Sequence, residues 1–120
     1  MRHLAQTLLI VAATSCFSLP ALAASLTPKE IQSTFGTGTP FSSSTPTGTT
    51  YSIVLKSDGT ASRTPKRSKT VITGTWHVSK DGYCSTWGKG IENCYKIEKD
   101  KDRYRVLDRH GSLVAFWKTK

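Results

Sequence analysis

The chain is poor in acidic residues and in histidine. Its 120 residues include eight Asp and Glu and three His, so it has few side chains that act as general acids, general bases or metal ligands. It contains neither a nucleophile elbow nor an HExxH motif. Most of its aspartates stand beside glycine or in short charged stretches, where aspartate favours turns. The sequence therefore predicts no catalytic residue, no metal site and no cofactor, and it favours a non-enzymatic protein.

Long apolar segments are also scarce, and the main one lies at the N-terminus. This run, Leu8–Phe17, follows Arg2 and precedes the small residues of Ala21-Leu22-Ala23. A basic start, a short apolar middle and small residues before the cleavage point are typical of a secretory signal peptide. The run is shorter than the roughly 20 residues needed to span a bilayer. We expect residues 1–24 to be a signal peptide and residues 25–120 to be one exported domain, without a transmembrane segment. The periplasm is the favoured location, and full secretion is the alternative.

Cysteine is rare, and the three cysteines are not expected to have the same role. Cys16 lies inside the signal peptide, whereas Cys84 and Cys94 remain in the exported domain. An even pair of cysteines in an oxidising compartment predicts a disulfide. Closing so short a loop adds roughly 2–3 kcal/mol of stability, which matters in a domain with a thin core.

Charge is strongly one-sided. The net charge is +9, and loss of Arg2 with the signal peptide leaves +8. A small basic domain attracts anionic partners, and after export these would be anionic lipid, lipopolysaccharide or acidic polysaccharide rather than nucleic acid. The alternative is that basicity only maintains solubility. The segment 61–69 suits an exposed loop or edge, and it holds the candidate anion-binding residues Arg63, Lys66, Arg67 and Lys69.

The remaining pattern predicts a mainly β domain that begins with one helix. Thr27 and Glu30 form a T-x-x-E capping box around Pro28, which predicts a helix over about 27–35. Residues 36–50 read as a flexible Gly/Ser/Thr/Pro connector. Six short strands follow over 51–118, separated by turns such as Asp58-Gly59. We expect a small antiparallel meander closed into an up-and-down, lipocalin-like barrel, with the helix across it or plugging one end.

Alternation along the strands assigns the inner face. Tyr83, Ser85 and Trp87 share one face and Cys84 lies on the other, so the disulfide is expected to be a cross-strand link outside the core. On the last strand, either the odd or the even positions of 113–117 face inward. The prominent aromatic residues are core packing or, at Tyr83 and Trp87, the lining of an open ligand-binding mouth. These candidate aromatics are Trp76, Tyr83, Trp87 and Trp117.

Three stretches resemble a known family. Gly74-Thr75-Trp76, Asp81–Trp87 and Cys94-Tyr95 are similar to motifs of small exported bacterial proteins, mainly alphaproteobacterial, that form a domain of unknown function. The resemblance extends over roughly 26–118 and implies no activity. Gly74-x-Trp76 is also similar to the signature of calycin barrels, which implies a barrel that binds small ligands.

These features favour an exported, non-enzymatic binding or envelope-accessory protein whose basic surface contacts an anionic envelope component. Two other functions stay open. One is inhibition of a secreted hydrolase, with a secreted protein as partner. The other is transport of a small apolar ligand, which requires a cavity in place of a filled core.

Overall fold

The computed structural model describes residues 24–119. The predicted signal peptide, apart from Ala24, lies outside the described residues. Over residues 24–119 the chain forms one helix and eight strands. These are α1 (Pro28–Phe35), β1 (Phe41–Ser44), β2 (Thr50–Leu55), β3 (Thr60–Pro65), β4 (Ile72–Ser79), β5 (Gly82–Trp87), β6 (Asn93–Asp100), β7 (Arg103–Leu107) and β8 (Leu113–Lys118).

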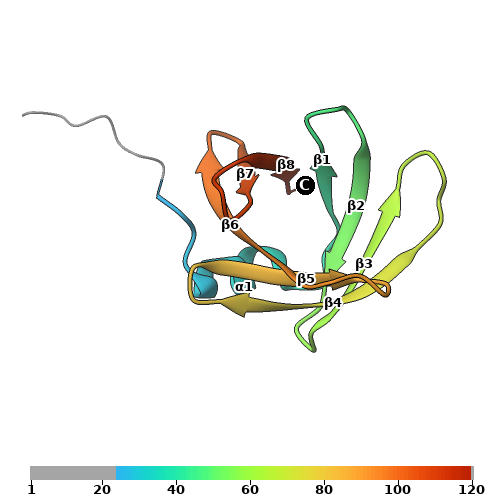
Figure 1. Cartoon of the computed structure of the whole chain (residues 1–120), viewed down its shortest axis with the longest axis horizontal. Coiled ribbons are helices and arrows are strands. Elements are labelled where there is room, and N and C mark those ends of the chain that lie inside the picture. The colour runs from blue at the N-terminus through green and yellow to red at the C-terminus, as the bar shows by residue number, and fades with distance from the viewer. Residues whose placement is uncertain (1–23, 120) are drawn as a thin grey trace, which may run out of the picture.

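The strands form a closed antiparallel barrel in chain order (Figure 1). Each strand pairs with the next, and β1 pairs with β8 from Ser42↔Lys118 to Ser44↔Phe116. Closure gives every strand two neighbours and leaves no unpaired edge. The predicted mainly β barrel with one short helix and one disulfide is confirmed.

Two details of the predicted strand pattern are wrong. The segment 36–50, expected to be a flexible connector, contains β1, and the segment 61–69, expected to be an exposed loop or edge, contains most of β3. Serine- and threonine-rich segments can join a sheet because the ladder uses main-chain groups, which every non-proline residue carries. β1 is held between β2 and β8, and β3 between β2 and β4. The barrel therefore has eight strands where the sequence pattern indicated six.

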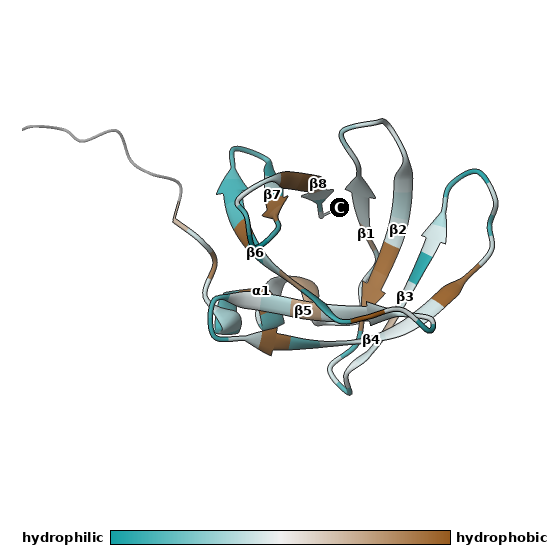
Figure 2. Cartoon of the chain, in the orientation of Figure 1, coloured by the Kyte–Doolittle hydropathy of each residue, from teal (hydrophilic) through white to brown (hydrophobic). Residues whose placement is uncertain are grey.

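The helix closes one end of the barrel, as expected. Its capping box is formed, with Thr27 Oγ1 accepting from the Glu30 amide and Glu30 Oε1 accepting from the Thr27 amide. Ile31 and Phe35 are fully buried. The Phe35 ring lies 4.9 Å from each of three other rings, those of Phe41, Tyr104 and Trp117. In Figure 2 hydrophobic residues appear as bands within otherwise hydrophilic strands, as one-sided burial requires.

The connections alternate between the two ends of the barrel. The turns 56–59, 80–81 and 101–102 lie at the end that α1 covers. The loops 45–49, 66–71, 88–92 and 108–112 lie at the opposite, open end, and we call them the mouth loops. Among residues 24–119, no helix combines the length and hydropathy needed to cross a membrane.

Candidate functional site

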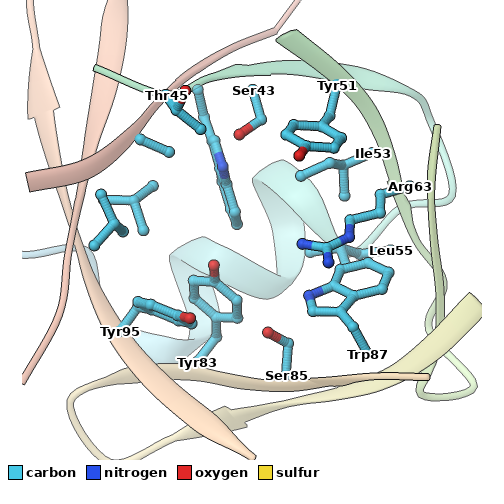
Figure 3. Close-up of a pocket in the computed structure, with 14 residues that line it drawn as sticks. Ser43, Thr45, Tyr51, Ile53, Leu55, Arg63, Tyr83, Ser85, Trp87 and Tyr95 are labelled. Atoms are coloured by element: carbon cyan, nitrogen blue, oxygen red, sulfur yellow. The ribbon is translucent and has the colours of Figure 1, made fainter. Parts of the chain in front are cut away.

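The open end of the barrel leads into a cavity of about 160 Å³. Residues from every strand except β4 line it, together with Thr45 of a mouth loop. In Figure 3 α1 lies behind these side chains, beyond the floor of the cavity, and none of its residues lines the cavity. Tyrosine, serine and arginine groups lie among apolar ones, so the cavity offers both apolar contact and hydrogen bonds. Concave sites of this composition commonly bind small ligands.

Three of the four candidate aromatic residues line the cavity. These are Tyr83, Trp87 and Trp117, and the Tyr83 ring lies 5.0 Å from the Trp117 ring. Trp76 does not line the cavity, and its Nε1 donates to the Lys56 carbonyl at 2.7 Å. Tyr83 and Trp117 belong to the buried core together with Trp76, so the core and cavity interpretations both apply to these two residues.

The glycine of the Gly74-x-Trp76 motif makes room for the ring of Trp87. It pairs with Trp87 across β4 and β5. A Cβ atom at this position would collide with the Thr86 carbonyl and lie 3.0 Å from Trp87 Cε3. Glycine thus allows the Trp87 ring to lie against β4 and contribute to the cavity wall.

The sequence predicts Arg63 on an exposed loop or edge together with Lys66, Arg67 and Lys69, and for Arg63 this prediction is wrong. It belongs to β3, and its side chain points into the cavity (Figure 3). Its Cζ lies 4.7 Å from the centre of the Trp87 ring and 5.4 Å from that of Tyr51. Both distances are in the range of cation–π contacts. Ala61 and Arg63 are two positions apart, and this spacing was the only sign in the sequence that the Arg63 side chain points inward. The charge of arginine favoured the opposite direction, toward solvent.

The other three candidate residues, Lys66, Arg67 and Lys69, lie exposed on the mouth loop 66–71. The remaining mouth loops add Lys89 and Arg109. Against these five basic residues the mouth loops carry two acidic ones, which leaves a net charge of +3 with His110 neutral. The turns at the helix end carry three basic and three acidic residues and are neutral. Among the connections between strands, the basic excess is concentrated at the open end.

The mouth loops also carry exposed apolar side chains. Val71 is 58% exposed and Ile91 is 80% exposed, and they are the large hydrophobic residues that stand out as exposed in the described part of the chain. In Figure 2 the β3–β4 loop is hydrophilic and becomes hydrophobic where β4 begins. Exposed apolar residues beside basic ones are typical of surfaces that contact membranes.

Two tyrosines of the cavity are held in their neutral form. Burial raises the pKa of Tyr83 well above its ordinary value of 10.0, and the neighbouring Tyr95 adds to this effect. Burial also raises the pKa of Tyr95, although Arg63 opposes the shift. Both hydroxyls therefore remain protonated, and can donate hydrogen bonds, at neutral pH.

The raised pKa of Tyr83 predicts loss of stability in alkali. Above about pH 10 the unfolded chain loses the Tyr83 proton while the folded chain keeps it. The contribution is therefore complete below pH 10, and the free energy of unfolding falls by up to about 1.4 kcal/mol per pH unit above it. Urea unfolding from pH 8 to 11 should show a shallower fall for Tyr83→Phe than for the wild type. Equal slopes would contradict the assignment.

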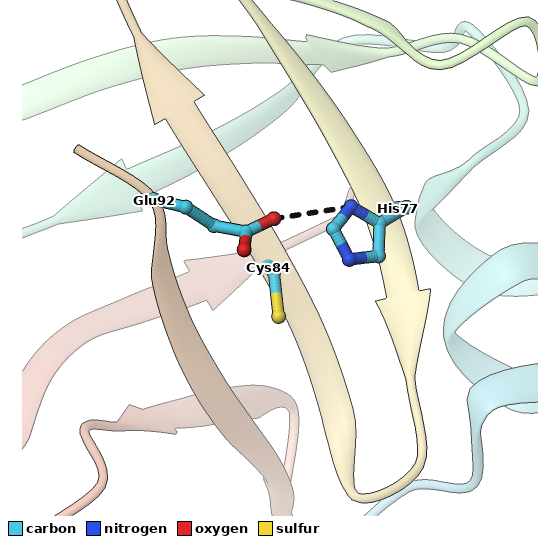
Figure 4. Close-up of side chains that lie close together, drawn as sticks. All are labelled: His77, Cys84 and Glu92. Carbon is cyan, nitrogen blue, oxygen red and sulfur yellow. Dashed lines mark ion pairs between the residues drawn. The ribbon is translucent and has the colours of Figure 1, made fainter. Parts of the chain in front are cut away.

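A separate group of potential metal ligands lies on the outer face. Atoms of His77, Cys84 and Glu92 lie within 4.8 Å of one another (Figure 4), and His77 Nδ1 lies 3.4 Å from Glu92 Oε1. The Cys84 sulfur, however, is bonded to Cys94, its direct partner across β5 and β6. This leaves one imidazole and one carboxylate, whereas zinc sites use three or four protein ligands. The predicted disulfide is confirmed, and it lies on the face away from the cavity.

No protein-family model, no curated protein and no solved structure matches this chain. The resemblance to small exported bacterial proteins therefore stays a prediction. The fold and the cavity define a small closed antiparallel barrel with one end covered by a helix and a cavity at the other.

Proposed function

We propose that this chain is an exported, non-enzymatic binding protein that contacts the anionic lipid surface of the cell envelope with the open end of its barrel. The observation that carries the proposal is the unequal charge of the connections at the two ends of the barrel. The mouth loops have a net charge of +3, whereas the turns at the helix end are neutral. An anionic surface attracts such a molecule and orients it with the mouth toward the surface.

The apolar side chains at the mouth favour a lipid surface over a soluble polyanion. Ile91 and Val71 are exposed on neighbouring mouth loops, where they have little to contact in the isolated protein. At a bilayer they would enter the boundary between headgroups and acyl chains, while Lys66, Arg67 and Lys69 remain among the headgroups. A polysaccharide offers the charge but no apolar layer.

Neutralising the basic residues of loop 66–71 is expected to abolish most of this binding. Each Lys or Arg near an anionic membrane contributes about 1 kcal/mol, so the combined variant Lys66→Gln, Arg67→Gln and Lys69→Gln should bind roughly 100-fold more weakly. Co-sedimentation with vesicles of phosphatidylglycerol and phosphatidylcholine, measured over a salt series, tests this. Binding of the wild type should weaken as the salt concentration rises, and the wild type should not bind vesicles of pure phosphatidylcholine.

The helix end provides a matched control. The combined variant Lys56→Gln, Lys80→Gln and Lys101→Gln removes the same charge from the turns beside α1, and it should keep most of the binding. Equal losses in both variants would mean that total charge alone is responsible. Unchanged binding in the variant of loop 66–71 would contradict the proposal and would mean that these basic residues only maintain solubility.

A further inference from the structure

The cavity contains a cation that the protein itself does not neutralise. Among residues 24–119, the ion pairs involve other basic residues, and none includes Arg63. Its buried Nε atom has no hydrogen-bond partner. The Arg63 side chain as a whole is half-buried, and a charged group partly withdrawn from water normally lies beside a counter-charge or acceptors, because its desolvation is costly. The guanidinium of Arg63 is therefore set up to receive an acceptor from outside the chain.

We propose that the barrel cavity binds a small organic carboxylate, with its acid group on Arg63 and its apolar body directed toward the floor. A guanidinium offers parallel N–H groups that fit the two oxygens of a carboxylate. The Trp87 and Tyr51 rings beside Arg63 hold the guanidinium in place. This fixed position lowers the entropy lost when the ligand binds.

Neighbouring hydroxyls complete the polar part of the site. Tyr83, Ser85 and Ser43 line the same cavity, and Figure 3 shows Ser85 next to Trp87 and the Tyr83 hydroxyl pointing toward the middle of the cavity. Because burial raises the pKa of Tyr83, its hydroxyl stays a donor and adds no negative charge to repel an anion. No carboxylate side chain is among the residues that line the cavity. The site is therefore selective for anions.

The size of the cavity sets the size of the ligand. Its volume is about 160 Å³, similar to an engineered apolar cavity of about 150 Å³ that holds benzene. Ile53, Leu55 and Ala115 supply the deeper apolar wall. A single ring or a short alkyl chain fits this space, whereas a long-chain lipid does not.

The first test uses the wild-type protein and three probes of equal size and different charge. Isothermal titration at pH 7 with benzoate, benzyl alcohol and benzylamine should give tightest binding for benzoate, by about 10-fold or more over the alcohol. Benzylamine should give no detectable heat. Equal affinity for the alcohol, preference for the amine, or no binding of benzoate up to about 10 mM would each overturn the proposal.

The second test assigns the selectivity to Arg63. Arg63→Met should weaken benzoate binding by about 10- to 100-fold and leave benzyl alcohol unchanged, provided near-UV circular dichroism shows the native fold. Arg63→Lys keeps the charge but loses the parallel N–H groups of the guanidinium, so it should bind benzoate with intermediate affinity. Loss of both probes in Arg63→Met would give Arg63 a purely structural role.

This inference does not depend on the proposed envelope contact, and the variants separate the two. The triple variant of loop 66–71 should lose vesicle binding and still bind benzoate. Arg63→Met should lose benzoate and still bind vesicles. Failure in only one assay would overturn only the corresponding proposal.

Discussion

Replacing Phe35 by alanine is expected to destabilise the protein by about 3–5 kcal/mol. The Phe35 side chain is fully buried and lies against the rings of Phe41, Tyr104 and Trp117. Its loss would leave a cavity where the helix meets β1, β7 and β8, and the rigid barrel can fill that space only in part. For a domain of this size the midpoint of thermal unfolding should fall by about 15 °C or more.

Two variants on the same helix control this prediction. Ser33→Ala changes an exposed residue and should alter the free energy of unfolding by less than about 0.5 kcal/mol. Phe35→Leu keeps most of the volume and should cost less than Phe35→Ala. Urea unfolding measures all three. A cost below about 1 kcal/mol for Phe35→Ala would mean that the helix is not part of the cooperative core.

Removal of the disulfide is expected to cost about 2–3 kcal/mol. The bond closes a loop with a sequence separation of 10 residues between β5 and β6, and it reduces the conformational freedom of the unfolded chain. The combined variant Cys84→Ala and Cys94→Ala should therefore unfold at lower urea concentration than the oxidised wild type. Benzoate binding should persist in the folded variant, because the bond lies on the face away from the cavity.

Reduction of the wild type is the matching control. With a thiol reductant present, the wild type should become about as unstable as the double variant, and the double variant should not respond. A double variant as stable as the oxidised wild type would show that the bond adds nothing to stability.

Local signals in the sequence were sufficient for the helix and for most strands. The N-terminus of α1 depends on Thr27, Pro28 and Glu30, which lie within four consecutive residues, and the structure begins the helix at Pro28. β1 could not be identified in this way. Its four residues include one apolar side chain, Phe41, and its stability comes from main-chain pairing with β2 and with β8 at the far end of the sequence.

The candidate site was predictable only in part, for a related reason. Tyr83 and Trp87 follow a clear alternation on one strand, so their inward direction was evident. The position of Arg63 depends on Trp87 and Tyr51, which come from other strands and make an inward guanidinium tolerable. The gathering of positive charge at the mouth likewise required the topology, because the basic residues belong to separate loops.

The pairing of β1 with β8 has a consequence for how the chain folds. Every other strand pair is a hairpin that can form from neighbouring residues, whereas this pair joins Ser42 to Lys118, 76 positions apart. Its formation requires closure of a long loop, which has a high entropic cost and slows folding. The Phe35 ring contacts both Phe41 and Trp117, so the helix can hold the first and last strands together at this junction. Removal of β8 would therefore open the barrel and leave β1 and β7 each with one unpaired edge, and such edges favour aggregation.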